Sequence, residues 1–164
     1  MTPRSAGATA HKTADLYLGD WELIPELCVY EFGSAPVTGA YLIAKQGRKL
    51  RITIEWSMSA GTEAQSTGFE APPDGSPQPV PAGVTGSGPD TFTLTRVDER
   101  TLDSAAFRGE EQVAYARRVA SVDGALLAVV QEARDPHGER YRNFQVYRRR
   151  GVRRGANGRR RMGS

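Results

Sequence analysis

Few side chains of this 164-residue chain are of a type and spacing that could do chemistry. The two histidines are His11, close to the start of the chain, and His137, in a turn-like run at 135–138. The one cysteine, Cys28, excludes an internal disulfide and fits a reducing compartment. Because no histidine falls on a predicted strand and no His, Cys and carboxylate cluster has ligand spacing, we expect no metal, no cofactor and no catalysis.

Two adjacent arginines form the most informative polar feature. Arg117 and Arg118 interrupt an apolar run that extends from 113 to 120. Neighbouring residues of a strand point to opposite faces, so one arginine is expected to face the interior. A buried arginine requires a carboxylate or a ligand anion, and Glu55 and Glu132 are the protein candidates. The alternative is that both arginines extend to the surface or are paired there.

The elements that must position these side chains are strands. Turn-forming Asp, Gly and Pro residues separate runs rich in Val, Tyr, Phe and Thr, a pattern typical of antiparallel hairpins. Leu50, Ile52, Ile54 and Trp56 alternate strictly with polar residues. The predicted strands cover 21–24, 38–45, 49–57, 63–71, 91–97, 101–107, 112–121, 125–133 and 140–148. We therefore predict an all-β fold, a single antiparallel up-and-down β-barrel of about 8–10 strands, since closure removes exposed edges.

The barrel is expected to span residues 16–149. Residues 1–15 are small and polar, and residues 150–164 form an arginine- and glycine-rich tail, so both are predicted to be disordered. The 72–89 segment holds six prolines, which excludes a central strand and indicates a loop beside one barrel mouth. The sequence contains no run of about 20 apolar residues, which a membrane helix would need. No hydrophobic segment typical of a secretory signal follows Met1, so we expect a cytoplasmic protein.

Charge is divided unevenly along the chain. Residues 148–164 carry eight arginines and no acidic residue, whereas the whole chain has a net charge of +3, so residues 1–147 sum to −5. A basic tail on an acidic body predicts, at most, weak contact with a polyanion through Arg148 to Arg161. The tail lacks aromatic side chains that would stack on bases.

Several short motifs occur in a recognisable order over residues 19–149. They are Gly19-Asp20-Trp21, Leu23-Ile24-Pro25-Glu26, the run from Arg96 to Thr101, Ser121-Val122-Asp123-Gly124 and Val146-Tyr147-Arg148. Together they resemble the lipocalin-like (calycin) small β-barrel family, and most closely its bacterial lipocalin-like domain proteins. The arginine-rich tail departs from the family pattern, which would stop near Arg148.

The resemblance implies that one end of the barrel is closed by Trp21, which follows Gly19. An arginine of the last strand should pack over the indole ring, and Arg148 is the candidate by position. A guanidinium is weakly hydrated and stacks well on indole, which is consistent with this structural role.

The resemblance also implies non-catalytic binding of a small apolar or amphipathic molecule inside the barrel. The expected lining residues share one strand face, although an error of one residue in register would invert that face. They are Tyr41, Ile43, Ile54, Trp56, Phe69, Phe92, Leu94, Tyr115, Arg117 and Phe144. Three alternatives stay open: a packed barrel without a ligand, a polyanion-binding tail, and a barrel enzyme that uses Tyr115 and Arg117.

Overall fold

The computed structural model describes residues 14–80 and 88–151. The expectations for residues 1–13, which include His11, for 81–87 and for the tail at 152–164 lie outside the described residues. Within the described ranges, no helix is long and apolar enough to cross a membrane.

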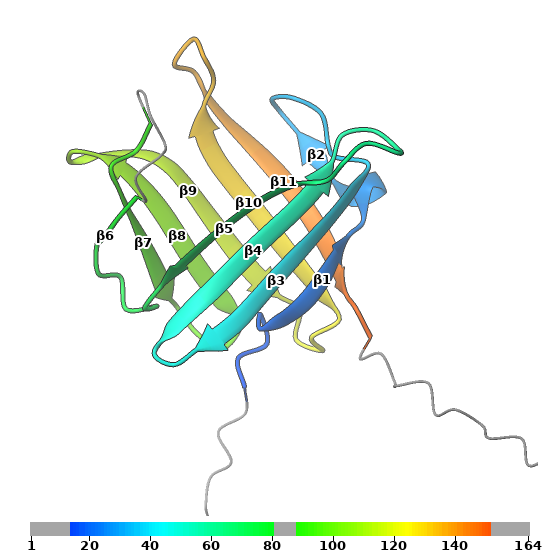
Figure 1. The fold of residues 1–164 in the computed structure, drawn as a ribbon, viewed down its shortest axis with the longest axis horizontal. Coiled ribbons are helices and arrows are strands. Elements are labelled where there is room, and N and C mark those ends of the chain that lie inside the picture. Colours follow the sequence, from blue (N-terminus) through cyan, green and yellow to red (C-terminus); the bar gives the residue numbers. More distant parts are fainter. Residues whose placement is uncertain (1–13, 81–87, 152–164) are drawn as a thin grey trace, which may run out of the picture.

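The prediction of an all-β, up-and-down fold is confirmed (Figure 1). In the described part of the chain, nine strands have five residues or more, and two others, β2 and β6, have two residues each. The elements are β1 (Gly19–Leu23), the 3-10 helix η1 (Pro25–Leu27), β2 (Val29–Tyr30), β3 (Thr38–Gln46), β4 (Lys49–Ser57), β5 (Gln65–Ala71), β6 (Gln78–Pro79), β7 (Thr91–Arg96), β8 (Thr101–Arg108), β9 (Glu111–Ala120), β10 (Leu126–Arg134) and β11 (Arg140–Arg149).

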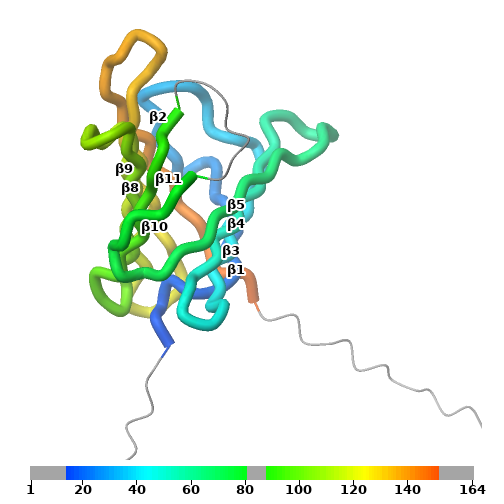
Figure 2. Tube along the Cα trace, turned by 60° about the vertical axis from the view of Figure 1, so that its left-hand side comes forward, coloured from blue at the N-terminus to red at the C-terminus, as the bar shows by residue number. Residues whose placement is uncertain are grey.

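The strands form one antiparallel sheet that curls into a nearly closed barrel (Figures 1 and 2). Their order is β5-β4-β3-β1-β11-β10-β9-β8-β7-β6, with β2 added on β11. Pairing of β1 with β11 joins the first strand to the last one. The path ends at β5 on one side and at β6 on the other, and these two strands do not pair.

Local sequence explains the early hairpin well. Gly47 has a φ of 60°, in the left-handed region that a tight turn between β3 and β4 requires and that glycine adopts without strain. Beyond it, Leu50 and Ile52 are buried while Lys49 and Arg51 are exposed, as the alternation predicts. The apolar residues of one phase therefore make the core.

The closed end of the barrel is built on Trp21, which is fully buried. Its indole Nε1 donates to the Tyr17 carbonyl at 3.0 Å. The guanidinium of Arg149 lies 4.2 Å from the ring centroid and donates to the carbonyls of Leu18 and Gly124 at 2.8 and 2.7 Å, and to that of Leu16. The stacked cation therefore also ties the incoming chain to the end of the barrel.

The prediction that Arg148 packs on Trp21 is wrong by one residue. In the β1–β11 register Trp21 is opposite Arg149, whereas Arg148 is opposite Glu22 and pairs with it on the outer face at 3.4 Å. Adjacent residues of a strand point to opposite faces, so an error of one position exchanges the inner and outer arginine.

A second contact holds the segment before β1 at this end. Arg96 bonds the Asp15 carboxylate through two nitrogens, at 2.9 and 3.1 Å, and the Tyr17 hydroxyl donates to the same carboxylate. The Arg96 hydrogen bond holds the pKa of Asp15 below its usual value. Ion pairing, rather than apolar burial alone, therefore fastens residues 15–17 across the closed end.

Candidate functional site

A cavity of about 610 Å³ lies inside the barrel, toward the end opposite Trp21. A volume of this size suits a small-molecule ligand. Its walls come from β5 and β7 to β11, together with Val80 and Pro89 at the ends of the described loop segments. The lining residues are Thr67, Gly68, Phe69, Val80, Pro89, Phe92, Ser104, Ala105, Ala106, Ala114, Tyr115, Ala116, Gln131, Glu132, Ala133 and Tyr141.

Small side chains leave this space open. On the inner faces of β8 and β9, Ala106 is paired with Ala114, and Ser104 with Ala116. Four small residues thus lie side by side where larger ones would fill the barrel. Phe69 of β5 and Phe92 of β7 supply the apolar ring surface, with their centroids 5.6 Å apart. The cavity surface near these residues is therefore mainly apolar.

Arg118 is a buried charge beside the cavity wall. It is opposite Leu102 and Val129, which are both fully buried, and is itself 2% exposed. Its Nε donates to the Tyr41 hydroxyl at 2.7 Å, and its Nη1 donates to Ser104 Oγ at 3.0 Å. The aromatic rings of Tyr41 and Phe69 lie 5.5 and 6.0 Å from its Cζ, which adds cation–π attraction.

No carboxylate among the described residues pairs with Arg118. Its third nitrogen, Nη2, also lacks a hydrogen-bond partner in the described part of the chain, although every fully sealed side-chain nitrogen and oxygen there has one. Nη2 is therefore not sealed in. Ser104 and Phe69 both line the cavity and both contact Arg118, so the guanidinium lies beside the cavity wall, although Arg118 is not itself a lining residue.

A series of hydrogen-bonded polar side chains lies beside Tyr41. Its ring makes an edge contact with Tyr147, at 5.3 Å between centroids. The Tyr147 hydroxyl donates to Gln145 Oε1 at 2.8 Å, and the Gln145 amide donates to the Tyr30 hydroxyl. Burial raises the pKa of Tyr147, so this phenol stays protonated and neutral across the physiological range. The core near Arg118 therefore contributes hydroxyl groups and no negative charge.

The structure brings some of the predicted lining residues to the cavity and places others in the core. Phe69 and Phe92 line it. Tyr41, Ile43 and Leu94 are fully buried core residues, and Ile54 packs against that core. Trp56 shares the inward phase but lines a different hollow at the end of β4.

Arg117 and Phe144 do not face the cavity, which corrects the prediction. Arg117 is opposite Val130 and bonds Asp103 on the outer face through two nitrogens at 2.8 Å. Glu55 and Glu132 were the expected partners of an inward-facing arginine; Asp103 instead pairs with the outer Arg117, and neither glutamate pairs with the buried Arg118. Phe144 is opposite Val29 on the outside and is 39% exposed. On both β9 and β11, the residues predicted to face inward are therefore one position away from those that do.

Tyr115 borders the cavity but directs its hydroxyl away from it. The hydroxyl donates to Asp103 Oδ2 at 2.9 Å, beside Arg117 on the outer face. Burial, with the Asp103 hydrogen bond, raises the pKa of Tyr115. Its polar group is therefore committed to the outer ion pair and is not offered to a ligand.

Sequence reasoning missed Ser104, Gln131 and the alanines of β8 and β9 as site residues. Gln131 is opposite Ala116, which is itself opposite Ser104, so these three residues lie at one level of the barrel. Their only local signal is the run of small residues in Ser104-Ala105-Ala106 and in Ala114 to Ala116. That signal is equally consistent with a packed strand until the register is known.

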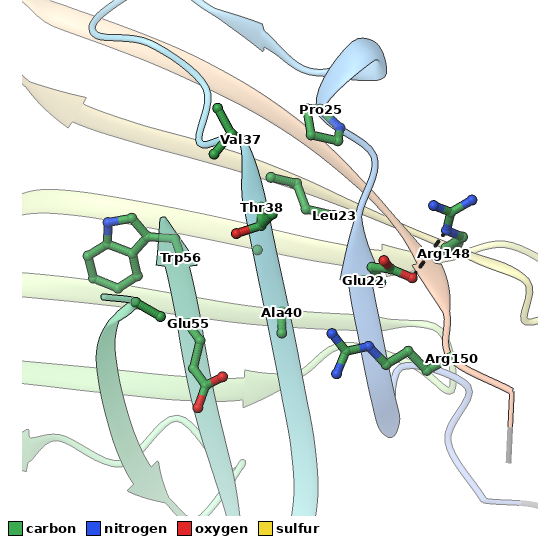
Figure 3. A pocket seen from close by; sticks show the side chains of 12 residues that line it. Glu22, Leu23, Pro25, Val37, Thr38, Ala40, Glu55, Trp56, Arg148 and Arg150 are labelled. Atoms are coloured by element: carbon green, nitrogen blue, oxygen red, sulfur yellow. Dashed lines mark ion pairs between the residues drawn. The ribbon is translucent and has the colours of Figure 1, made fainter. Parts of the chain in front are cut away.

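A second, smaller hollow of about 360 Å³ lies outside the barrel over β1, β3 and β4 (Figure 3). Its small floor is made by Gly39 and Ala40, and Trp56 and Glu55 lie on the β4 side. On the other side Glu22 forms an ion pair with Arg148, drawn in the figure. Its charged lining residues, Glu22, Glu55, Arg148 and Arg150, are exposed or half-buried and none of them is buried, so we assign the candidate site to the barrel interior.

Comparison with known proteins identifies the fold and no family. No protein-family model matches the chain, and a search of curated proteins finds no match to it. Among solved structures, secretory abundant heat soluble protein 4 from Ramazzottius varieornatus is similar, with a TM-score of 0.51 and 14% identity. The similarity covers 85% of this chain and 98% of that one. At this identity the likeness shows the fold alone: a nearly closed antiparallel β-barrel, compatible with a lipocalin-like architecture.

Proposed function

We propose that the barrel binds a small amphipathic molecule without transforming it, and that the molecule carries an acidic head group. The observation that supports this most strongly is Arg118, a buried cation with no carboxylate partner among the described residues. An uncompensated buried charge is costly, so a ligand anion would relieve a defect that the protein alone leaves in place. Nη2 is the donor that remains for it.

The rest of the cavity suits an apolar body. The rings of Phe69 and Phe92 and the methyl groups of Ala106 and Ala114 would bury ligand surface, which is the main driving force for association. The carboxylate or phosphate of the ligand would accept from Arg118 Nη2, with Ser104 at the same end. Charge-assisted hydrogen bonds of this kind orient a ligand as well as hold it.

A binding role, rather than an enzymatic one, is favoured by the state of the ionisable lining groups. The Glu132 carboxylate accepts from Arg142 at 2.8 Å, and the Tyr115 hydroxyl is bonded to Asp103. A general acid or base needs a proton that it can exchange with substrate. Neither group is presented in that way, which supports a carrier or sensor of the ligand.

The decisive comparison uses two adjacent arginines. Arg118→Met should weaken binding of anilinonaphthalene sulfonate, an amphipathic anion whose fluorescence rises in apolar sites, by about 10- to 100-fold, the value of one to two charge-assisted contacts. Arg117→Met, on the outer face of the same strand, is the matched control and should leave the affinity within about twofold. Circular dichroism verifies that both variants fold.

Equal affinities for the two variants would contradict the assignment of Arg118. Native mass spectrometry of the full chain, as purified from its host, then tests for a natural ligand. A retained small acid that is lost in Arg118→Met would support the proposal. Binding of nucleic acid that disappears with salt would instead favour the polyanion-binding tail.

A further inference from the structure

We propose that the ligand reaches the cavity sideways, through the seam between β5 and the β6–β7 edge, and that Phe69 and Phe92 form the gate. This inference rests on the proposed function. The seam is where the strand path of the described sheet ends, since β5 and β6 lie at its two ends and do not pair with each other. Figure 1 shows β5 diverging from β6 and β7 above the point where the chain passes between them.

The two sides of the seam are built differently. The β7 side is covered by residues 73–80, which bond along it: Arg96 N to Pro73 O and Gly75 N to Leu94 O at 2.9 Å each, then the pairing of Gln78 with Phe92. Pro73, Pro77 and Pro79 lack a backbone N–H, so this covering strip presents few donors toward β5. The strip therefore cannot form a continuous backbone hydrogen-bond ladder with β5, as a regular strand would.

The β5 side has a free edge along most of its length. Beyond its pairing with β4, no backbone hydrogen bond joins β5 to another described residue. Its residues from Gln65 to Gly68 are exposed. β5 ends at Ala71, and Pro72 connects it directly to the covering strip at 73–80. The two sides of the seam are therefore joined by the chain at this end. β5 is thus fixed at one end and held through β4 alone elsewhere.

Side chains close the seam. Phe69 on β5 and Phe92 on β7 meet edge to face, with 5.6 Å between centroids and 77° between ring planes. Both rings line the cavity, as do Thr67 and Gly68 on one side and Val80 on the other. A ring contact of this kind separates by rotation of two side chains, whereas the rest of the wall is held by strand hydrogen bonds.

The rim next to β11 is fastened more firmly. Asn143 Oδ1 accepts from the backbone N–H of Glu31 and of Phe32, at 3.1 and 3.3 Å, and its amide donates back to the Phe32 carbonyl. Phe32 also stacks on Tyr141, a cavity residue, at 5.0 Å. Access on this side would require several hydrogen bonds to break together, whereas the seam requires only that two rings separate.

Cross-linking tests the route directly. In a Cys28→Ser background, Phe69→Cys and Phe92→Cys are joined by a short bis-maleimide, and stopped-flow fluorescence follows anilinonaphthalene sulfonate. Relative to the same protein before linking, both association and dissociation rate constants should fall by about tenfold or more, with little change in affinity. The matched control links Leu42→Cys to Thr53→Cys, partners on the already paired strands β3 and β4 that do not line the cavity, and should change neither rate.

Three outcomes are distinguishable. Unchanged rates in the linked protein overturn the seam route and leave the proposed function intact. Absence of dye binding to the unmodified protein overturns the proposed function and the route with it. If the double cysteine variant does not fold, Phe92→Ala replaces it: loss of the ring contact should raise the association rate constant, which loss of ligand contact surface alone would not do, and an unchanged association rate constant would count against the gate.

Discussion

Removal of the guanidinium that covers Trp21 is the sharpest test of the closed end. Arg149→Met keeps an apolar side chain of similar length but removes three hydrogen bonds to backbone carbonyls and the stacking on the indole. With about 1 kcal/mol for each partly exposed hydrogen bond and about 1 kcal/mol for the cation–π contact, the variant should lose about 3–5 kcal/mol of unfolding free energy. That is a large part of the stability of a typical domain.

Arg148→Met is the matched control, because the same substitution is made one residue earlier. Arg148 makes one exposed ion pair, with Glu22, so its loss should cost at most about 0.5 kcal/mol. Arg149→Lys keeps the charge without the planar fork and should fall between the two, at about 2 kcal/mol.

The assay is equilibrium unfolding in urea, which does not screen charges, followed by tryptophan fluorescence and circular dichroism. For Arg149→Met the midpoint should fall by more than about 1 M with an unchanged slope, whereas for Arg148→Met it should hardly move. Equal shifts for the two variants, or a larger shift for Arg148→Met, would refute the assignment of Arg149 to the Trp21 ring and the β1–β11 register on which it depends.

Three other predictions follow from the same contacts. Asp15 has a lowered pKa, so the stability it contributes is present above its unfolded-state value of 3.8 and is lost as pH falls through the lower folded value; the difference in urea midpoint between wild type and Asp15→Asn should therefore be complete at pH 7 and shrink below about pH 4. Gly19→Ala should cost about 1–3 kcal/mol by thermal unfolding, since φ is 137° and a Cβ would collide with the Arg149 guanidinium, whereas Gly47→Ala, at φ 60° with open space around it, should cost about 1 kcal/mol. Ala106→Leu should fill the cavity and abolish dye binding in a fluorescence titration, and Ala128→Leu, on the outer face of β10, should leave it intact; equal binding by both would place the dye elsewhere.

The strands could be predicted because their information is local. In β4, Leu50 and Ile52 alternate with charged residues, and Gly47 marks the turn before them, so both the element and its buried face follow from neighbouring residues. The covering role of an arginine on Trp21 was expected too. The identity of that arginine could not be predicted, because Arg148, Arg149 and Arg150 are the same residue type and only the pairing of β11 with β1 distinguishes them.

The site was less predictable for the same reason. In β9, small and apolar residues occupy both faces around Arg117 and Arg118, so no local contrast tells the inner arginine from the outer one. The register with β8 and β10 decides it: Arg118 lies between Leu102 and Val129, and Arg117 lies beside Asp103. The inner polar level of Ser104, Ala116 and Gln131 likewise exists only once three strands are aligned.

The amino-acid sequence by itself therefore determined the class of the protein: alternating strands, short turns, a tryptophan at one end and an apolar interior. Tertiary structure alone decided which side chains meet, namely Arg149 on Trp21, Arg118 against Tyr41 and Ser104, and Phe69 against Phe92 across an unpaired seam. The physical reason is that a strand's period of two residues fixes which positions share a face but not which face is inside. That choice is made by the hydrogen-bond register between segments far apart in the chain.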